Sequence, residues 1–193
     1  GTPLVSDPGY KLISTLIKNN IKIIPLPGPT SVIPALVGSG LPTDKFCFFG
    51  FLPKKNNEIK KILVKCSADT GTLIFFESPH RIVSTLNIIN DLFGNEARIC
   101  IAKEISKIHE KFLRGTACEI LLDFNKDKNL LKGEFILMVN LLSSDEDTSI
   151  ADKLFENLSG KISNKELAKL SSEITGINKN FLYERFLSFS KKT

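Results

Sequence analysis

The sequence predicts an α/β layered domain followed by a small helical module. Short runs of apolar and β-branched residues alternate with segments whose apolar side chains repeat at helical spacing. That order is typical of helices layered on a sheet. After a polar, acidic linker at 143–149 (SSDEDTS), the rest of the chain has only helical patterns. Hydrophobic residues make up 42% of the 193 residues, an ordinary share for a globular protein with a buried core.

The first elements follow from capping residues and periodicity. Residues 7–20 are expected to form a helix with Asp7 as its N-cap, because aspartate accepts hydrogen bonds from the free amides of a first turn. The run 21–25 (IKIIP) is expected to be a short strand. A second short helix is expected to begin near Thr30 or Ser31.

The alternating pattern continues through the middle of the chain. The run 72–76 (TLIFF) is almost entirely apolar, as in strands that are buried on both faces of an α/β sheet. The expected strands lie at 46–49, 72–76, 98–102, 111–114 and 135–140. The expected helices lie at 56–66, between Ser78 and Gly94, and near 116–122.

Capping signals divide the C-terminal module. Ser163 and Glu166 have the spacing of a capping box, and Asn178 can cap a final helix after a break at Gly176. Two helices around a short glycine-containing turn indicate a helix-turn-helix-like unit, and a plain helical bundle fits the pattern equally well. The expected apolar faces consist of Leu167, Leu170 and Ile174 in the first helix, and Leu182, Phe186 and Phe189 in the second.

Composition narrows the class of partner and compartment. The net charge of +5 favours a polyanionic partner, although a lysine-rich composition unrelated to any partner would give the same charge. No window has the roughly 18 uninterrupted apolar residues of a membrane helix, so no membrane partner is expected. Three of the four cysteines have apolar neighbours and are expected to be buried thiols in a reducing cytoplasm. With only His80 and His109 as histidines, no metal site is expected.

Three polar segments go beyond ordinary core patterns. Residues 1–9 (GTPLVSDPG) combine glycine, which lets a ligand approach the backbone, with a helix start that presents free amides. Residues 25–31 (PLPGPTS) contain prolines that stiffen a crossing between two structural units. Residues 75–81 (FFESPHR) end an apolar strand at the edge where open α/β sheets bind ligands. Taken singly, each segment also has a structural interpretation: a common loop, a rigid linker, or a capped helix start.

In their order along the chain, these segments carry a specific resemblance. GTPLVSDPG, PLPGPTS, GLPTDKFCFFGFLP, TLIFFESPHR and KGEFILMV resemble the RsmI-type family of small-subunit ribosomal-RNA 2′-O-ribose methyltransferases, in the tetrapyrrole-methylase superfamily. The resemblance covers almost the whole chain. It implies two α/β domains with S-adenosylmethionine in the cleft between them, a homodimer, and methylation of a cytidine ribose in the decoding region of 16S rRNA.

The resemblance also implies a division of the chain. Residues 1–26 match a remnant of the N-terminal α/β domain, 27–142 match the second α/β domain, and 143–193 match the linker and C-terminal helical module. The family pattern has a further region before Gly1. We therefore expect an N-terminally truncated chain whose first domain is largely missing, and which alone is inactive.

The family motifs assign site residues to this sequence. The cofactor-binding residues that they imply are Gly1, Thr2, Pro3, Val5, Thr30, Ser31, Glu77, Ile105, Gly133 and Glu134. A ribose hydroxyl is a poor nucleophile, so a base should assist it, and Glu104 is the candidate. Arg81 is the candidate group for holding a phosphate, with Lys103 as an alternative.

Two other functions remain open. The same fold could methylate a small tetrapyrrole precursor, or the chain could be a non-catalytic RNA-binding fragment. A lysine-rich helix and the C-terminal module favour contact with phosphates of the small ribosomal subunit. Phe181, Phe186 and Phe189 could instead pack the module onto the α/β domain or onto a dimer partner. The lysines of the helix are Lys54, Lys55, Lys60, Lys61 and Lys65.

Overall fold

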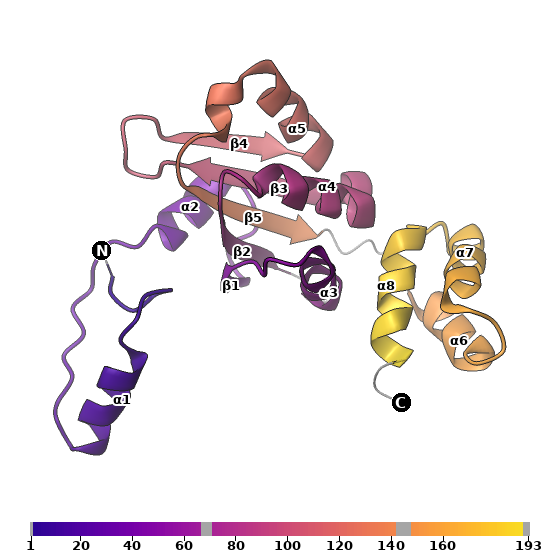
Figure 1. Ribbon diagram of the computed structural model, residues 1–193, viewed down its shortest axis with the longest axis horizontal. Helices are drawn as coiled ribbons and strands as arrows, with labels where there is room; N and C mark the ends of the chain where they lie inside the picture. The colour runs from indigo at the N-terminus through magenta and orange to yellow at the C-terminus, as the bar shows by residue number, and fades with distance from the viewer. Residues whose placement is uncertain (1, 67–70, 142–147, 191–193) are drawn as a thin grey trace.

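Five strands form one mixed sheet in the order β1-β2-β5-β3-β4 (Figure 1). The computed structural model describes residues 2–66, 71–141 and 148–190. β1 and β2 are parallel, whereas β5 is antiparallel to both β2 and β3, and β4 is antiparallel to β3. The strands are β1 (Phe46–Phe51), β2 (Thr72–Glu77), β3 (Ala97–Lys103), β4 (Lys111–Gly115) and β5 (Phe135–Leu141). The strands predicted from residue 46 onward are all confirmed, each one or two residues longer than expected.

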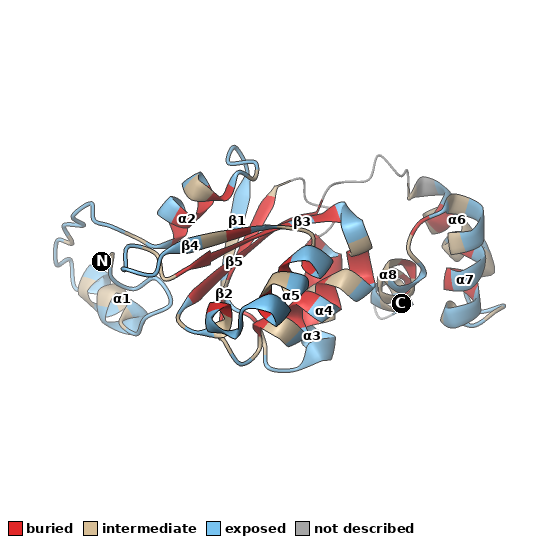
Figure 2. Ribbon diagram, turned by 90° about the horizontal axis from the view of Figure 1, so that it is seen from above, coloured by how far each residue is buried: buried red, intermediate tan, exposed pale blue. Residues whose placement is uncertain are grey.

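Helices cover both faces of the sheet, with α3, α4 and α5 on one side and α2 on the other (Figure 2). The helices before the C-terminal module are α1 (Tyr10–Lys18), α2 (Val32–Ser39), α3 (Asn56–Cys66), α4 (Ile82–Phe93) and α5 (Ala117–Lys126), with 3-10 turns η1 (Gly94–Glu96) and η2 (Lys128–Leu131). Among the described helices, none is both long enough and apolar enough to cross a membrane. The predicted α/β layered architecture is therefore confirmed.

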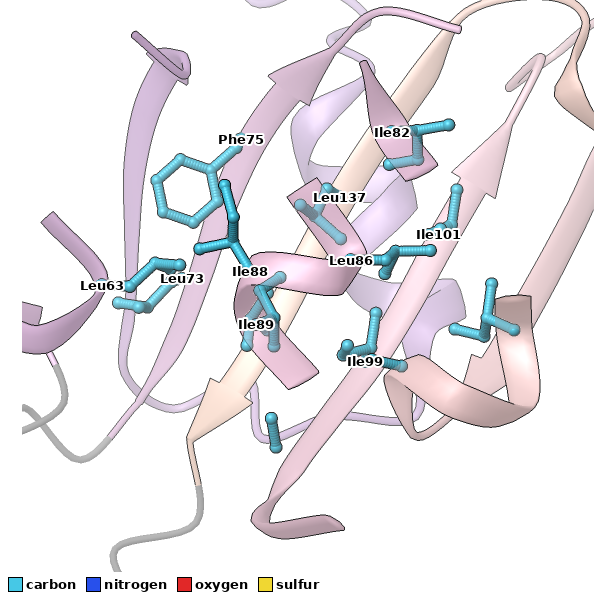
Figure 3. Close-up of a cluster of buried hydrophobic side chains, with 14 of the residues drawn as sticks. Leu63, Leu73, Phe75, Ile82, Leu86, Ile88, Ile89, Ile99, Ile101 and Leu137 are labelled. Carbon is cyan, nitrogen blue, oxygen red and sulfur yellow. The ribbon is translucent and has the colours of Figure 1, made fainter. Parts of the chain in front are cut away.

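The larger core lies between the sheet and helices α3, α4 and α5 (Figure 3). Leu86 and Ile89 of α4 are fully buried, and they face a sheet surface that includes Ile101 and Leu137. Burying each such side chain contributes about 1.5–3 kcal/mol. Alternation along the strands divides the cores: Ile101 belongs to this one, whereas Ala102 faces α2.

Helix α2 is held close to β4 at its C-terminal end. The Arg114 guanidinium donates hydrogen bonds to the carbonyl oxygens of Gly38 and Ser39, the latter at 3.0 Å. These carbonyls have no partner within the helix, so the arginine satisfies them. A Cβ atom at Gly38 would lie 2.4 Å from the Phe112 ring, so glycine is needed for this close approach.

Two N-terminal predictions are wrong. Asp7 is not an N-cap, because α1 begins at Tyr10 after Gly9, whose φ of 133° suits glycine. Residues 21–25 form no strand, because no other described segment pairs with them, and a strand needs a neighbour for its backbone groups. The helix α1 buries none of its residues and leaves the apolar side chains of Leu12 and Ile17 exposed.

Two further predictions require correction. Helix α4 begins at Ile82 rather than Ser78, because residues 78–81 form a turn in which the Arg81 N–H donates to the Ser78 carbonyl at 3.1 Å. Two of the four cysteines are buried rather than three: Cys66 and Cys100 are buried, while Cys47 and Cys118 are exposed. Burial raises the pKa of Cys100 to about 11.

The C-terminal module has three helices and a core of its own. The helices are α6 (Ser149–Leu158), α7 (Asn164–Thr175) and α8 (Lys179–Ser190). The predicted capping box at Ser163 and Glu166 is present, and the Asn178 side chain accepts hydrogen bonds from the first amides of α8. The predicted apolar face of α7 is partly wrong: Leu170 and Ile174 are exposed, and α7 instead buries Ala168 and Ser171 beside Leu167. The predicted linker falls mainly on residues 142–147, outside the described residues.

Helix α8 joins this module to the α/β layer. The Phe181 ring lies 5.8 Å from the Phe93 ring, and the Asn180 amide donates to the Asp91 carbonyl at 3.2 Å. Phe186 and Phe189 instead pack on Phe155 inside the module, at 5.1 and 5.3 Å between ring centroids. Of the three phenylalanines considered from the sequence, Phe181 thus packs on the α/β layer.

We expect Phe186→Ala to destabilise the chain by about 3–5 kcal/mol, because it empties a fully buried ring site between α6, α7 and α8. Urea unfolding of the whole chain would measure the loss. Ile174→Ala on α7 is the matched control: its side chain is 55% exposed, so we expect little change. Equal losses in the two variants would show that the α7 face is placed incorrectly.

Candidate active site

A cavity of about 480 Å³ opens at the edge of the sheet where β1, β2 and β3 end and β5 begins. Its volume is within the range of small-molecule sites. Most of its sheet-derived wall comes from the face that α2 covers, including Phe76, Ala102 and Ile136. The loop at residues 5–7 forms another part of the wall. The cavity therefore lies where segments that are far apart in the sequence meet.

The wall combines apolar surface with acidic groups. Phe51, Phe76 and Ile105 contribute aromatic and aliphatic surface, whereas Asp7 and Glu134 contribute carboxylates. No lysine, arginine or histidine is among the described residues that line the cavity. Such a wall suits a ligand with a flat apolar part and a positive charge, because carboxylates and aromatic faces both attract cations.

A buried carboxylate fixes the loop at the end of β2. The Glu77 side chain is 1% exposed. Its oxygens accept hydrogen bonds from the Ser78 N–H at 2.8 Å, the Thr85 hydroxyl at 2.8 Å and the Arg81 guanidinium at 3.0 Å. Arg81 also donates to the Leu52 carbonyl at 3.0 Å. A buried charge is tolerated only when it is paired and hydrogen-bonded, so this network holds residues 78–81 in one conformation at the rim of the cavity.

A reciprocal contact joins the end of β3 to the start of β5. The Glu104 N–H donates to the Glu134 carbonyl at 3.0 Å, and Glu104 Oε1 accepts from the Glu134 N–H at 2.8 Å and from Lys107 Nζ at 3.0 Å. The Glu134 amide, and then Lys107, hold the pKa of Glu104 below its ordinary value. At Gly133, φ is 104° and a Cβ atom would lie 2.6 Å from Glu104 Cγ, so this contact requires glycine.

The remaining loops are tied together and strained. The Thr2 N–H donates to the Pro29 carbonyl at 2.7 Å and its hydroxyl to the Gly28 carbonyl at 3.0 Å, so residues 2–9 are held against residues 28–31. Four of the five described non-glycine residues with positive φ lie next to a lining residue. Leu4 and Ser6 stand on either side of Val5, and Glu104 and Ser106 stand on either side of Ile105. Strained backbone of this kind clusters at ligand sites.

The structure brings six of the predicted cofactor-binding residues to the cavity wall. They are Val5, Ser31, Glu77, Ile105, Gly133 and Glu134. Thr2, Pro3 and Thr30 lie beside these residues in the same two loops without lining the cavity, and Gly1 is outside the described residues. The predicted catalytic residues, Glu104 and Arg81, lie behind the wall, each bonded to a residue that lines it. Lys103 lines a different cavity.

Sequence reasoning missed more than half of the wall. The missed residues are Ser6, Asp7, Phe51, Phe76, Ser78, Pro79, Ala102, Phe135 and Ile136. Most of them stand at strand ends, and strand pairing brings them together: Phe51 lies opposite Phe76, and Phe135 lies opposite both Glu77 and Lys103. The rule that ligands bind at strand ends pointed to the segment 75–81, which contains Phe76, Ser78 and Pro79, without naming them singly. Joining that segment to Phe51, Phe135 and Ile136 requires the strand order.

A helix-covered mixed sheet with a cavity at its strand ends defines an α/β domain with a cavity of the size that small molecules occupy. A crystal structure described as the methyltransferase CobJ shares this fold, with a TM-score of 0.52 and 17% identity over 73% of this chain and 62% of that one. The sequence model of the family described as Tetrapyrrole (Corrin/Porphyrin) Methylases matches residues 1–121. The tetrapyrrole-methylase fold predicted from the sequence is thereby confirmed.

Several relatives are called ribosomal RNA small subunit methyltransferase I. The chain is 38% identical to that of Escherichia coli O157:H7 over 95% of this chain, 36% identical to that of Haemophilus influenzae over 100%, and 44% identical to that of a Hydrogenobaculum species over 72%. It spans 65%, 69% and 60% of those relatives' lengths, respectively. The protein belongs to the tetrapyrrole methylase family and, within it, to the family of these ribosomal RNA methyltransferases.

We expect Glu77→Gln to lower the free energy of unfolding by about 1–3 kcal/mol, because the neutral amide leaves Arg81 without its carboxylate partner and places an NH₂ group beside other donors. Thermal unfolding would measure the change. Glu134→Gln is the matched control: this carboxylate is 84% exposed and its pairing with Lys107 should contribute under about 1 kcal/mol. A Glu77 variant as stable as the control would contradict the role assigned to this network.

Proposed function

We propose that the protein is an S-adenosylmethionine-dependent methyltransferase that acts on the 2′-hydroxyl of a cytidine ribose in the decoding region of 16S rRNA. The observation that carries this proposal is the convergence of Val5, Ser31, Glu77, Ile105, Gly133 and Glu134 on one cavity. Five of them come from four separate motifs that carry the family resemblance, and Ile105 follows the strand β3. The names of the relatives support an RNA substrate over a tetrapyrrole one.

The cavity wall fits the proposed cofactor. The aliphatic and aromatic side chains of Val5, Phe76 and Ile105 provide an apolar surface for an adenine ring. The carboxylates of Asp7 and Glu134 can attract the positive charges of a sulfonium and an amino group. When bound, S-adenosylmethionine would supply a methyl group to an oxygen nucleophile.

The chain's own residues would position the ribose and exclude water. We propose that Glu104 accepts a hydrogen bond from the ribose hydroxyl at Oε2, since Oε1 accepts from Lys107 and from the Glu134 N–H. Arg81 is proposed to hold a substrate phosphate with the part of its side chain that stays exposed, about 30%. Alignment of the hydroxyl with the methyl donor would provide much of the rate enhancement.

A group of lysines at helix α3 supports a ribosomal partner. Lys54, Lys55, Lys61 and Lys65 at helix α3 are exposed. Lysines of this kind contact phosphates and fix position without reading sequence. We further propose that the enzyme works in the cytoplasm on the small ribosomal subunit, as a homodimer.

We expect the protein, at the full length of its relatives, to transfer labelled methyl groups from S-adenosylmethionine to small ribosomal subunits or to naked 16S rRNA, with the label on a cytidine ribose. We expect the 193 residues alone, which span 65% of the length of the Escherichia coli relative, to transfer none. Ile105→Arg should abolish labelling, because it places a large cation in a cavity proposed to bind a cation. Ile108→Arg, in the same loop but 97% exposed, is the matched control and should retain labelling. Label on a tetrapyrrole precursor alone would refute the RNA assignment. RNA binding without S-adenosylmethionine binding by calorimetry would indicate a non-catalytic module.

We expect Glu104→Gln to lower turnover more than it raises the dissociation constant of S-adenosylmethionine, if the carboxylate acts on the ribose hydroxyl. The donors around Glu104 lower its pKa, so it stays deprotonated as the pH falls. Turnover that depends on it should decline only below the ordinary carboxyl pKa of about 4.3. Single-turnover rates of the variant and the wild type between pH 5 and 8 measure the loss of turnover and show whether the wild-type rate stays free of a decline in this range. Unchanged turnover in the variant would remove Glu104 from the mechanism.

A further inference from the structure

A second cavity, of about 540 Å³, lies at the same edge of the sheet but on the face that carries α4 and α5. Lys103, Lys111 and Lys132 contribute three cations to its lining, with Glu110 as the one acid. His109 and Asn129 also line it. We call this cavity the lysine pocket. It does not share any described lining residue with the candidate active site.

Two of these lysines lie directly opposite one another. Lys103 on β3 pairs with Lys111 on β4, two residues along from the apolar pair of Ile101 and Leu113. Directly opposite residues of an antiparallel pair project from the same face, and like charges in this position destabilise a sheet. At this end of the β3–β4 hairpin, the last apolar pair is therefore followed, on the same face, by a pair of lysines.

The lysine charges of this pocket are only partly compensated within the described part of the chain. Lys103 is 8% exposed, and neither its side chain nor that of Lys111 makes a hydrogen bond or ion pair with a described residue. The Lys132 ammonium donates to the Asn129 amide oxygen, at 3.1 Å. Of the two nearby acids, Glu110 accepts from the Ser106 N–H at 2.7 Å, and Glu104, which interacts with Lys103 only through its charge, binds Lys107 and the Glu134 N–H. Three lysines and one acid line the pocket, and this excess of positive charge suits an anion.

We propose that the lysine pocket binds a phosphodiester group of the RNA substrate, an inference that rests on the function proposed above. A phosphate presents several acceptor oxygens, and three ammonium groups with a histidine supply matching donors. The position of the pocket favours RNA over a free anion. Lys103 directly follows Ala102, and Lys132 directly precedes Gly133, and both of those neighbours line the candidate active site. A strand with one nucleotide at the active site would thus pass its neighbouring phosphates along this edge.

The test uses the two exposed lysines, because the buried Lys103 is also needed for packing. Lys111→Gln and Lys132→Gln are compared with Lys126→Gln, an exposed lysine on α5 that pairs with Asp123. Binding of the chain to naked 16S rRNA is measured at several salt concentrations. We expect each pocket variant to bind more weakly and to flatten the slope of log affinity against log salt by about 0.7–0.9, and the control to leave it unchanged. Inorganic phosphate at millimolar concentration should not displace the RNA.

Thermal stability without RNA separates a ligand site from a structural one. Lys111→Gln removes a like-charge repulsion, so we expect its melting temperature to rise, by up to about 4 °C. A structural lysine would give a fall. An unchanged salt slope, or a lower melting temperature with normal RNA affinity, would overturn the proposal. Displacement of RNA by inorganic phosphate would mean that the pocket is a free-anion site.

Methyl transfer and S-adenosylmethionine binding, measured on the same variants at the full length of the relatives, keep the two proposals apart. Normal cofactor binding is expected, because the lysine pocket lies outside the candidate active site. If the wild-type chain transfers methyl groups to rRNA but the pocket variants bind RNA normally, the pocket proposal fails alone. If the variants weaken RNA binding but no methyl transfer occurs, the proposed activity fails and the anion site stands.

Discussion

The position of β5 in the sheet determines where the sheet-derived wall of the candidate active site lies. All seven residues of this strand are buried, and it pairs with β2 on one side and β3 on the other along its length. Because β5 runs antiparallel to both neighbours, its first residues arrive at the edge where theirs end. Gly133 and Glu134 are therefore brought against the residues that follow β2 and β3, although they are about 30 or more residues away in sequence.

Two carboxylates then give that edge its shape. Glu77 anchors the loop after β2 from within the core, and Glu104 anchors the turn after β3 to the start of β5. Each carboxylate accepts a hydrogen bond from a backbone N–H of a loop as well as from side chains, so it binds the loop backbone directly. Glu104 has a positive φ at this turn, and its carboxylate links the turn to the start of β5. Beside Glu77, the wall includes Phe51, Phe76 and Ile105, the apolar surface that a partly apolar ligand requires.

Local signals were sufficient for the buried strands and for the caps at Ser163 and Asn178, and insufficient for the cap at Asp7 and for features that depend on neighbours. The run 72–76 could be assigned because an apolar stretch of that length has few alternatives, and the Ser163 capping box because both partners lie within one turn. The run 21–25 had the composition of a strand, but a strand forms only beside another. Leu170 and Ile174 fit a helical stripe, yet packing against α6 and α8 turned Ala168 and Ser171 inward. The cavity wall could not be assembled without the strand order, and the pairing of Lys103 with Lys111 could not be found without the register.

That register also explains how one strand can serve two sites. Successive side chains of β3 project from opposite faces of the sheet, so Ala102 lines the candidate active site and Lys103 lines the lysine pocket. A slip of one residue would place the lysine in the apolar cavity and leave the second cavity with a methyl group. Such a slip is opposed by apolar pairs along both edges of β3, including Ile99 with Val139 and Ile101 with Leu137 and Leu113. The hydrophobic core thus fixes which face holds the candidate active site and which holds the lysine pocket. Because Ala102 and Lys103 are adjacent in β3, the two cavities have a fixed relation to one another.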